Sequence, residues 1–412
     1  MSTTSSPYAA LKIRDYRYFI SARFCTTLAI QIQAVVVAWQ VYEITKDPLS
    51  LGLIGLAEAI PSISVSLYAG HIADIVQRKK IILLCLGTLF LCSGSLLFFT
   101  LEPGQFLLSY GVLPIYTVIF ISGIARGFMT PALFAFMPQL VPRELYSNAI
   151  TWNSTLWETA SLSGPPLGGL LYGFFGISVA YTTDVLLVFA GLILAFLVTD
   201  KPLPPSTTEE GIVEKIKAGL RFVYNNKIVL SAISLDLFAV LFGGAVALLP
   251  IFADTILHVG KVGLGFLRAA PGVGALLMAL YLVHHPIKQN AGKLLLYCVA
   301  GFGVCIIFFG LSTNFWISMF LLMMSGVFDC VSVIIRSTLL QTLTPENMKG
   351  RVSAVNHIFI GSSNEIGMFE SGLAASMFGV VRSVVLGGFM TLVVVGATSW
   401  FSKSLRTLQR VE

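Results

Sequence analysis

Long apolar runs separated by short polar turns cover almost the whole chain. A membrane-spanning helix needs about 20 predominantly apolar residues. Twelve runs have this length, namely 18–44, 50–73, 80–100, 110–136, 147–175, 179–198, 226–252, 262–284, 292–311, 314–340, 352–378 and 381–401. The pattern therefore predicts an all-α polytopic membrane protein with twelve transmembrane helices.

One polar stretch, Asp200 to Lys227, is much longer than the other connections. It begins with the proline-rich KPLPPSTTEE and continues with EKIKAGLRFVYNN, which has the pattern of an amphipathic helix. We therefore expect three parts: a six-helix bundle over 1–199, a cytoplasmic linker with an amphipathic helix over 200–225, and a second six-helix bundle over 226–412.

The two predicted bundles match each other in sequence. The stretch 120–153 aligns with 323–356 at a constant offset of 203, and both contain a proline in the turn between two helices. A second match pairs AEAIPS from Ala57 with LRAAPG from Leu267, at an offset of 210. Two matches in the same order at nearly equal offsets indicate a duplicated six-helix unit.

Composition agrees with a membrane protein, because 56% of the residues are hydrophobic and 11% are charged, whereas soluble domains have about 25% charged residues. With the N-terminus inside, the predicted cytoplasmic segments hold 20 of the 26 Lys and Arg residues. Cytoplasmic loops are enriched in these residues. We therefore expect a multi-pass protein of the plasma (inner) membrane with both termini in the cytoplasm.

Local motifs resemble the major facilitator superfamily. The loop GHIADIVQRKK, Gly70 to Lys80, is similar to the family's signature loop, and IARGFMTPA contains the arginine of its fourth-helix motif, Arg126. The fifth run contains SGPPLGG, which resembles the family's antiporter motif through four residues: Gly164, Pro165, Gly168 and Gly169. Within the superfamily, the chain looks most like the bacterial enterobactin-exporter-like and drug-efflux group. The resemblance implies two pseudo-symmetric bundles that rock about a central cavity.

Glycine and proline weaken a helix but let neighbouring membrane helices approach closely. The antiporter motif therefore predicts a bent fifth helix with a smooth face. The resemblance implies that this face packs on the helix 262–284, and ordinary helix packing without a role in transport is the alternative.

Ionisable side chains inside membrane spans are expensive and mark functional sites by default. Arg126 and Glu158 lie at similar predicted depth on adjacent helices, so we expect an ion pair that is either structural or involved in gating or substrate binding. Asp329 and Glu365 also lie at similar depth, and either is the predicted proton-coupling site. Arg336 lies on the same face as Asp329, and the alternative is that it neutralises one of the two carboxylates.

Three further charged positions have predicted roles. Asp236 is another carboxylate near mid-membrane with no obvious partner in sequence, and it is a second candidate for proton coupling. Glu58 and Arg268 come from equivalent positions in the two halves, which predicts an external gate pair. The resemblance implies that Asp74 contacts the start of the helix near Arg351 and latches the inside shut.

Polar and aromatic residues on the central helices predict a mixed lining suited to an amphipathic or lipophilic organic molecule. The candidates are Gln31, Gln33, Trp39, Asn153, Trp157, Asn356 and Asn364. A phosphate site would instead require clustered Arg or Lys.

The predicted function is a proton-coupled antiporter that exports a small organic compound by alternating access. Export of a siderophore or lysolipid, uptake by the same fold, and a membrane sensor without transport remain alternatives. No nucleotide-binding loop or histidine cluster occurs, so we expect no enzyme activity, cofactor or metal. The expected partners are substrate, protons and the lipid bilayer, without nucleic acid, and we expect a monomer.

Overall fold

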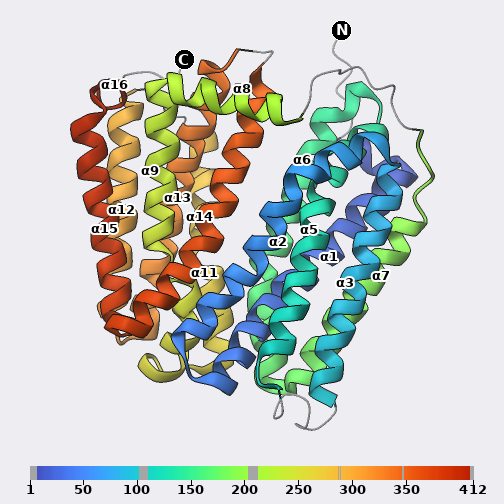
Figure 1. Ribbon diagram of the computed structural model, residues 1–412, viewed down its shortest axis with the longest axis horizontal. Helices are drawn as coiled ribbons and strands as arrows, with labels where there is room; N and C mark the ends of the chain where they lie inside the picture. Colours follow the sequence, from blue (N-terminus) through green and yellow to red (C-terminus); the bar gives the residue numbers. More distant parts are fainter. Residues whose placement is uncertain are drawn as a thin grey trace. The chain divides into compact units, whose positions relative to one another are not determined.

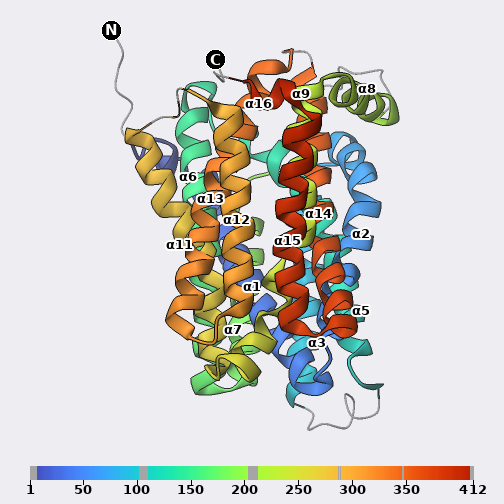
Figure 2. The same ribbon diagram turned by 90° about the vertical axis from the view of Figure 1, so that its left-hand side faces the viewer.

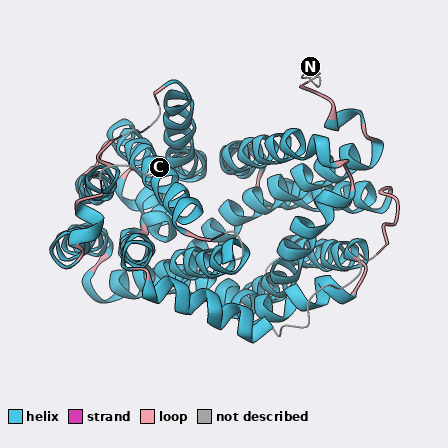
Figure 3. Ribbon diagram, turned by 90° about the horizontal axis from the view of Figure 1, so that it is seen from above, coloured by secondary structure: helices cyan, strands magenta, loops and turns pink. Residues whose placement is uncertain are grey.

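The computed structural model describes residues 7–101, 110–202, 212–285, 287, 289–345 and 348–408. Over these residues the protein consists of helices and connecting loops, without a strand (Figure 3). The fold class predicted from the sequence is therefore confirmed.

Twelve long elements follow the predicted runs. In the first half they are α1 (Arg14–Thr45), α2 (Pro48–Ile75), α3 (Arg78–Leu101), α5 (Leu113–Phe136), α6 (Tyr146–Leu170) and α7 (Ile177–Phe196). In the second half they are α9 (Lys227–Gly243), α11 (Gly260–His284), α12 (Ala291–Leu311), α13 (Phe315–Leu343), α14 (Lys349–Phe378) and α15 (Val380–Phe401). Short α10 (Leu249–Ile251) and α16 (Lys403–Arg406) accompany them.

The chain forms two compact units. Unit 1 comprises residues 1–44 and 60–208, and unit 2 comprises 45–59 and 209–412. The chain therefore passes between the units after Ile44, between Ala59 and Ile60 inside α2, and after Thr208 within the predicted linker.

In unit 1, α3 packs against both α5 and α7. Its core includes Tyr16 and Phe19 of α1, Leu89 of α3 and Phe136 of α5, all buried. Tyr16 also donates a hydrogen bond to the Ala149 carbonyl of α6 over 2.6 Å, which fixes the start of α1 against α6.

In unit 2, α12 packs against α13 and α15, and α9 packs against α14 and α15, as Figures 1 and 2 show. The predicted amphipathic linker helix is α8 (Ile212–Asn225), and it runs crosswise to α9 (Figure 1). Buried Val223 of α8 packs in one cluster with Val352 and Val355 of α14. The linker helix is therefore part of unit 2.

The predicted helix 226–252 is interrupted in the structure. Regular α9 ends at Gly243, and a 3-10 turn, α10 and a π turn over Phe252–Ile256 follow. Glycine favours such a break, and Pro250 removes a backbone donor. The Ser371 hydroxyl of α14 donates to the Gly244 carbonyl over 2.9 Å, which satisfies a backbone group that the break leaves without a helical donor.

Candidate functional site

Two of the twelve long helices are unusually polar. In the described part of the chain, ten helices are long and apolar enough to cross a membrane, and α6 and α14 are not among them. These two helices are the fifth and the eleventh predicted runs of the chain. Each is therefore the fifth helix of its half, and the two occupy equivalent places in the repeat. Polar side chains avoid lipid, so these helices are the first candidates for the surface along which a polar ligand crosses.

The polar residues of α6 are gathered on one exposed face. They recur at helical spacing and comprise Thr151, Ser154, Thr155, Glu158 and Thr159. Trp157 of the same helix is 43% exposed. Most of the hydroxyls bond to the carbonyl four residues earlier, as Thr155 does with Thr151 over 2.9 Å, so their donor capacity is largely used within the helix.

Glu158 does not pair with Arg126, contrary to the sequence prediction. The Glu158 side chain is exposed on α6, and it makes no ion pair within the described residues. The Arg126 charge instead acts on Cys92 of α3. Equal depth on adjacent helices was a necessary condition for the pair, but it was not sufficient.

Unit 2 contains a cluster of three charged residues, of which Asp236 and Arg336 are buried and Asp329 is half-buried. Arg336 of α13 forms an ion pair with Asp236 of α9, and both side chains are less than one-tenth exposed. The Asp236 and Arg336 charges both act on the carboxyl of Asp329, two turns away from Arg336 on α13. Asp236 therefore has a partner, and the two neighbouring carboxylates are Asp236 and Asp329 rather than Asp329 and Glu365.

Glu365 belongs to a different group. The carboxylates of Glu58 on α2 and Glu365 on α14 both interact electrostatically with the guanidinium of Arg268 on α11. The structure therefore brings the predicted Glu58 and Arg268 together, and it adds a second carboxylate that the sequence had assigned elsewhere. The first part of α2 lies close to α14. A Cβ added to Gly52 would lie only 3.0 Å from the Gly372 Cα.

The helix-5 motif also has a different neighbour from the one predicted. A Cβ added to Gly164 would collide with the Gln31 side chain of α1, and one added to Gly168 would lie 3.0 Å from the Ile32 carbonyl oxygen. Pro165 and Gly169 are buried in the same stretch. The smooth face at Gly164 and Gly168 therefore packs on α1 within unit 1, and the prediction of helix 262–284 is wrong for these two glycines.

The predicted substrate residues fall into two groups. Trp157 and Asn364 are exposed on the polar helices, and Asn153, Asn356 and Gln31 are half-buried. Asn153 accepts a hydrogen bond from Arg23 of α1 over 2.7 Å. In contrast, Trp39 is 5% exposed in the core of unit 1, and Gln33 is engaged with Asp184 and Ser93. The last two are therefore not presented to a ligand, which corrects their assignment.

A buried carboxylate in unit 1 was missed from the sequence. Asp184 of α7 is 1% exposed and accepts a hydrogen bond from the Gln33 amide over 3.1 Å. It stands alone in the apolar run YTTDVLLVF, so the rule that selected the other ionisable residues would have found it. The side chain of Asp74, which carried the predicted cytoplasmic latch, lies outside the described part of the structure.

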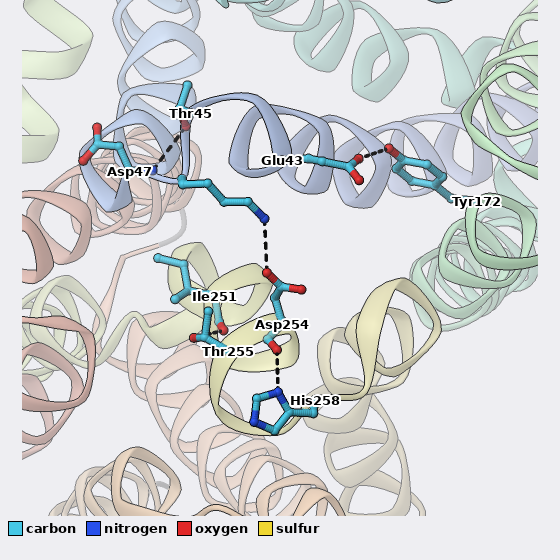
Figure 4. A network of polar contacts seen from close by, with 9 residues as sticks. Glu43, Thr45, Asp47, Tyr172, Ile251, Asp254, Thr255 and His258 are labelled. Atoms are coloured by element: carbon cyan, nitrogen blue, oxygen red, sulfur yellow. Dashed lines mark hydrogen bonds and ion pairs between the residues drawn. The ribbon is translucent and has the colours of Figure 1, made fainter.

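Polar side-chain contacts occur near the ends of helices within each unit (Figure 4). In unit 1, the Tyr172 hydroxyl donates to Glu43 over 2.7 Å. In unit 2, Lys46 pairs with Asp254 over 3.2 Å. Exposed pairs of this kind contribute at most about 1 kcal/mol to stability. The ion pair of Lys46 and Asp254 therefore adds little to the stability of unit 2.

A family model described as a transmembrane secretion effector, of the major facilitator type, matches residues 5–410. The chain belongs to this family. The enterobactin exporter EntS of Shigella dysenteriae serotype 1 is 28% identical over 386 residues, which are 92% of this chain and 89% of that protein. EntS of Escherichia coli O1:K1 has the same identity and coverage.

Solved transporter structures share the fold. The nucleoside transporter NupG has a TM-score of 0.72 at 12% identity, over 94% of this chain and 100% of that one. A D-xylose-proton symporter has a TM-score of 0.72 at 13% identity, over 97% and 99%. The chain is therefore a multi-pass membrane transporter of the major facilitator type, and these distant structures carry no information about its substrate.

Proposed function

We propose that this protein is a secondary exporter that exchanges a small amphipathic or lipophilic organic compound for protons by alternating access. The observation that carries the proposal is the cluster in unit 2 that joins the buried Asp236 and Arg336 with the half-buried Asp329. One cation faces two carboxylates there, and the cation is paired with Asp236. An uncompensated charge in a low-dielectric interior is costly, so Asp329 is stable when it carries a proton and releases it when water or a ligand reaches it.

A siderophore is the favoured compound among the alternatives. The relatives with the matched sequence are named enterobactin exporters, and the exposed Trp157 and amide Asn364 offer stacking and hydrogen bonding without a dense charge cluster. A stability screen of the purified protein against siderophores, drugs and lysolipids identifies the class. A ligand at 100 times its dissociation constant adds about 2.7 kcal/mol to the stability.

The direct test is transport in proteoliposomes with an imposed pH gradient. The wild type is expected to move the stabilising ligand against its gradient, with proton movement in the opposite direction. Asp329→Asn cannot release a proton, so it is expected to lose gradient-driven transport while it keeps exchange of labelled for unlabelled ligand across equal pH. Arg382→Gln, an exposed charge in α15, is the control and should behave as the wild type.

Two results would contradict the proposal. Ligand movement that does not depend on the pH gradient would exclude proton coupling. Binding without any flux, in protein that remains folded, would favour the sensor.

The group of Glu58, Arg268 and Glu365 is proposed as the external gate. Exchanging the first two, as Glu58→Arg with Arg268→Glu, should restore part of the transport that each single variant loses, because the attraction is preserved. Loss as severe in the double variant as in the single variants argues against a gate pair. Within the same proposal, Gly164, Pro165, Gly168 and Gly169 shape a bent α6 that moves with α1.

A further inference from the structure

The carboxyl of Asp184 is incompletely satisfied. Its Oδ2 accepts from the Gln33 amide of α1, and Ser93 of α3 adds a hydrogen bond to the carboxyl. Its Oδ1 has no hydrogen-bond partner among the described residues. With the residue 1% exposed, a full negative charge on this oxygen would lack compensation.

The charged and titratable neighbours of Asp184 do not neutralise it. On α3, Cys92 interacts electrostatically with Asp184 and with Arg126 of α5. On its own helix, Tyr181 lies one turn away and also interacts with it. No cation in the described part of the chain forms an ion pair with Asp184. A proton on the carboxyl removes the charge without any further partner.

The hydroxyls of Tyr181 and Tyr172 do not donate to Asp184, because each donates to another acceptor. Tyr181 donates to Gln40 over 2.6 Å, and Tyr181 interacts electrostatically with both Asp184 and Tyr172. Tyr172 in turn donates to the exposed Glu43 near the end of α1 over 2.7 Å (Figure 4). All of these residues belong to unit 1.

We propose that Asp184 is a proton-binding site in unit 1. In the loading step, Asp184 Oδ1 takes a proton from hydronium and gains an O–H bond, and water is left. The carboxyl changes from negative to neutral, and no oxidant or cofactor is required.

The site is separate from the Asp236, Asp329 and Arg336 cluster of unit 2. Unit 1 would therefore carry an ionisable group of its own in the proposed proton-coupled cycle, on which this inference rests.

Infrared spectroscopy of the purified protein tests the inference without any transport measurement. The wild type at neutral pH should show the C=O band of a protonated carboxylic acid, and Asp184→Asn should lose one component of it. Gln33→Leu keeps the carboxyl but removes a hydrogen bond, so it should shift that component to higher frequency. This second variant keeps the test valid if Asp184→Asn fails to fold.

Transfer to heavy water then identifies the band. The Asp184 component should move to lower frequency as its proton exchanges for deuterium. Tyr297→Phe, an exposed tyrosine of α12, is the control and should leave the component unchanged. An unchanged band in both Asp184→Asn and Gln33→Leu would overturn the proton site.

Discussion

The ion pair of Asp236 and Arg336 gives a prediction with a calculable size. Arg336→Gln removes the cation and leaves the buried Asp236 carboxylate beside the half-buried Asp329. Breaking a buried pair on one side costs about 3–5 kcal/mol. The loss of stability cannot exceed the free energy of protonating Asp236, because the unpaired carboxylate can take up a proton instead of staying charged. At pH 7, protonating an aspartate that ionises near pH 3.9 in water costs about 4 kcal/mol, so the two values agree.

The cost should depend on pH with a known sign. Protonation of the unpaired Asp236 carboxyl in this variant becomes easier as the pH falls, by about 1.4 kcal/mol per pH unit. The deficit of Arg336→Gln relative to the wild type should therefore shrink on acidification and grow at higher pH. The double variant Asp236→Asn with Arg336→Gln has no stranded charge, so it should recover most of the loss.

Thermal unfolding in detergent at a fixed scan rate measures these differences. About 4 kcal/mol corresponds to a shift of roughly 8–16 °C for a unit of about 200 residues. Arg382→Gln is the control for removal of an exposed arginine. The reasoning would be refuted if Arg336→Gln and the double variant lost the same stability, or if the loss did not change between pH 8 and pH 5.

Three other substitutions test contacts within single units. Gly52→Val should disrupt the close approach of α2 to Gly372 and cost about 1–3 kcal/mol by overpacking, visible as a lower unfolding temperature. Gly219→Val should lift α8 from α14, because a Cβ there would lie 2.8 Å from the Arg351 carbonyl oxygen, and should accelerate amide hydrogen exchange in α8. Arg23→Gln should weaken the charge-assisted bond to α6 by about 1–2 kcal/mol, and a destabilisation no larger than that of an exposed arginine would contradict it.

Helix positions were predictable because membrane burial imposes a simple rule. A span must satisfy its own backbone hydrogen bonds and be apolar over a fixed length, so ten of the elements follow directly from hydropathy, whereas α6 and α14 are more polar than this rule requires. The interruption after Gly243 was not predicted. The glycines and Pro250 are visible in the sequence, but the break requires Ser371 of α14 as an external donor, and hydropathy carries no information about that contact.

Charge partners were predicted less well than helices. Depth along a helix can be counted from a turn, and it correctly brought Glu58 near Arg268. It failed for Glu158, because the face that a side chain occupies depends on helix rotation and packing, which depth does not specify. Arg336 forms its ion pair with Asp236, and this partner also depends on the faces of the helices rather than on depth alone. The missed Asp184 was a different error, since the rule used for other buried charges applied to it unchanged.

The repeat does not make the two halves mechanically equivalent. Pro61 of α2 and Pro271 of α11 occupy matched positions, but Pro271 is held inside unit 2, where its carbonyl lies against Gly326 of α13. Pro61 instead lies two residues from the point at which α2 passes from one compact unit to the other. A proline removes one helical hydrogen bond and permits a bend. In the proposed alternating-access cycle the two units would move, and a helix shared between them would need such a bend, whereas α11 belongs to one unit and would not. The same residue in equivalent places therefore serves packing in one half and can serve as a hinge in the other.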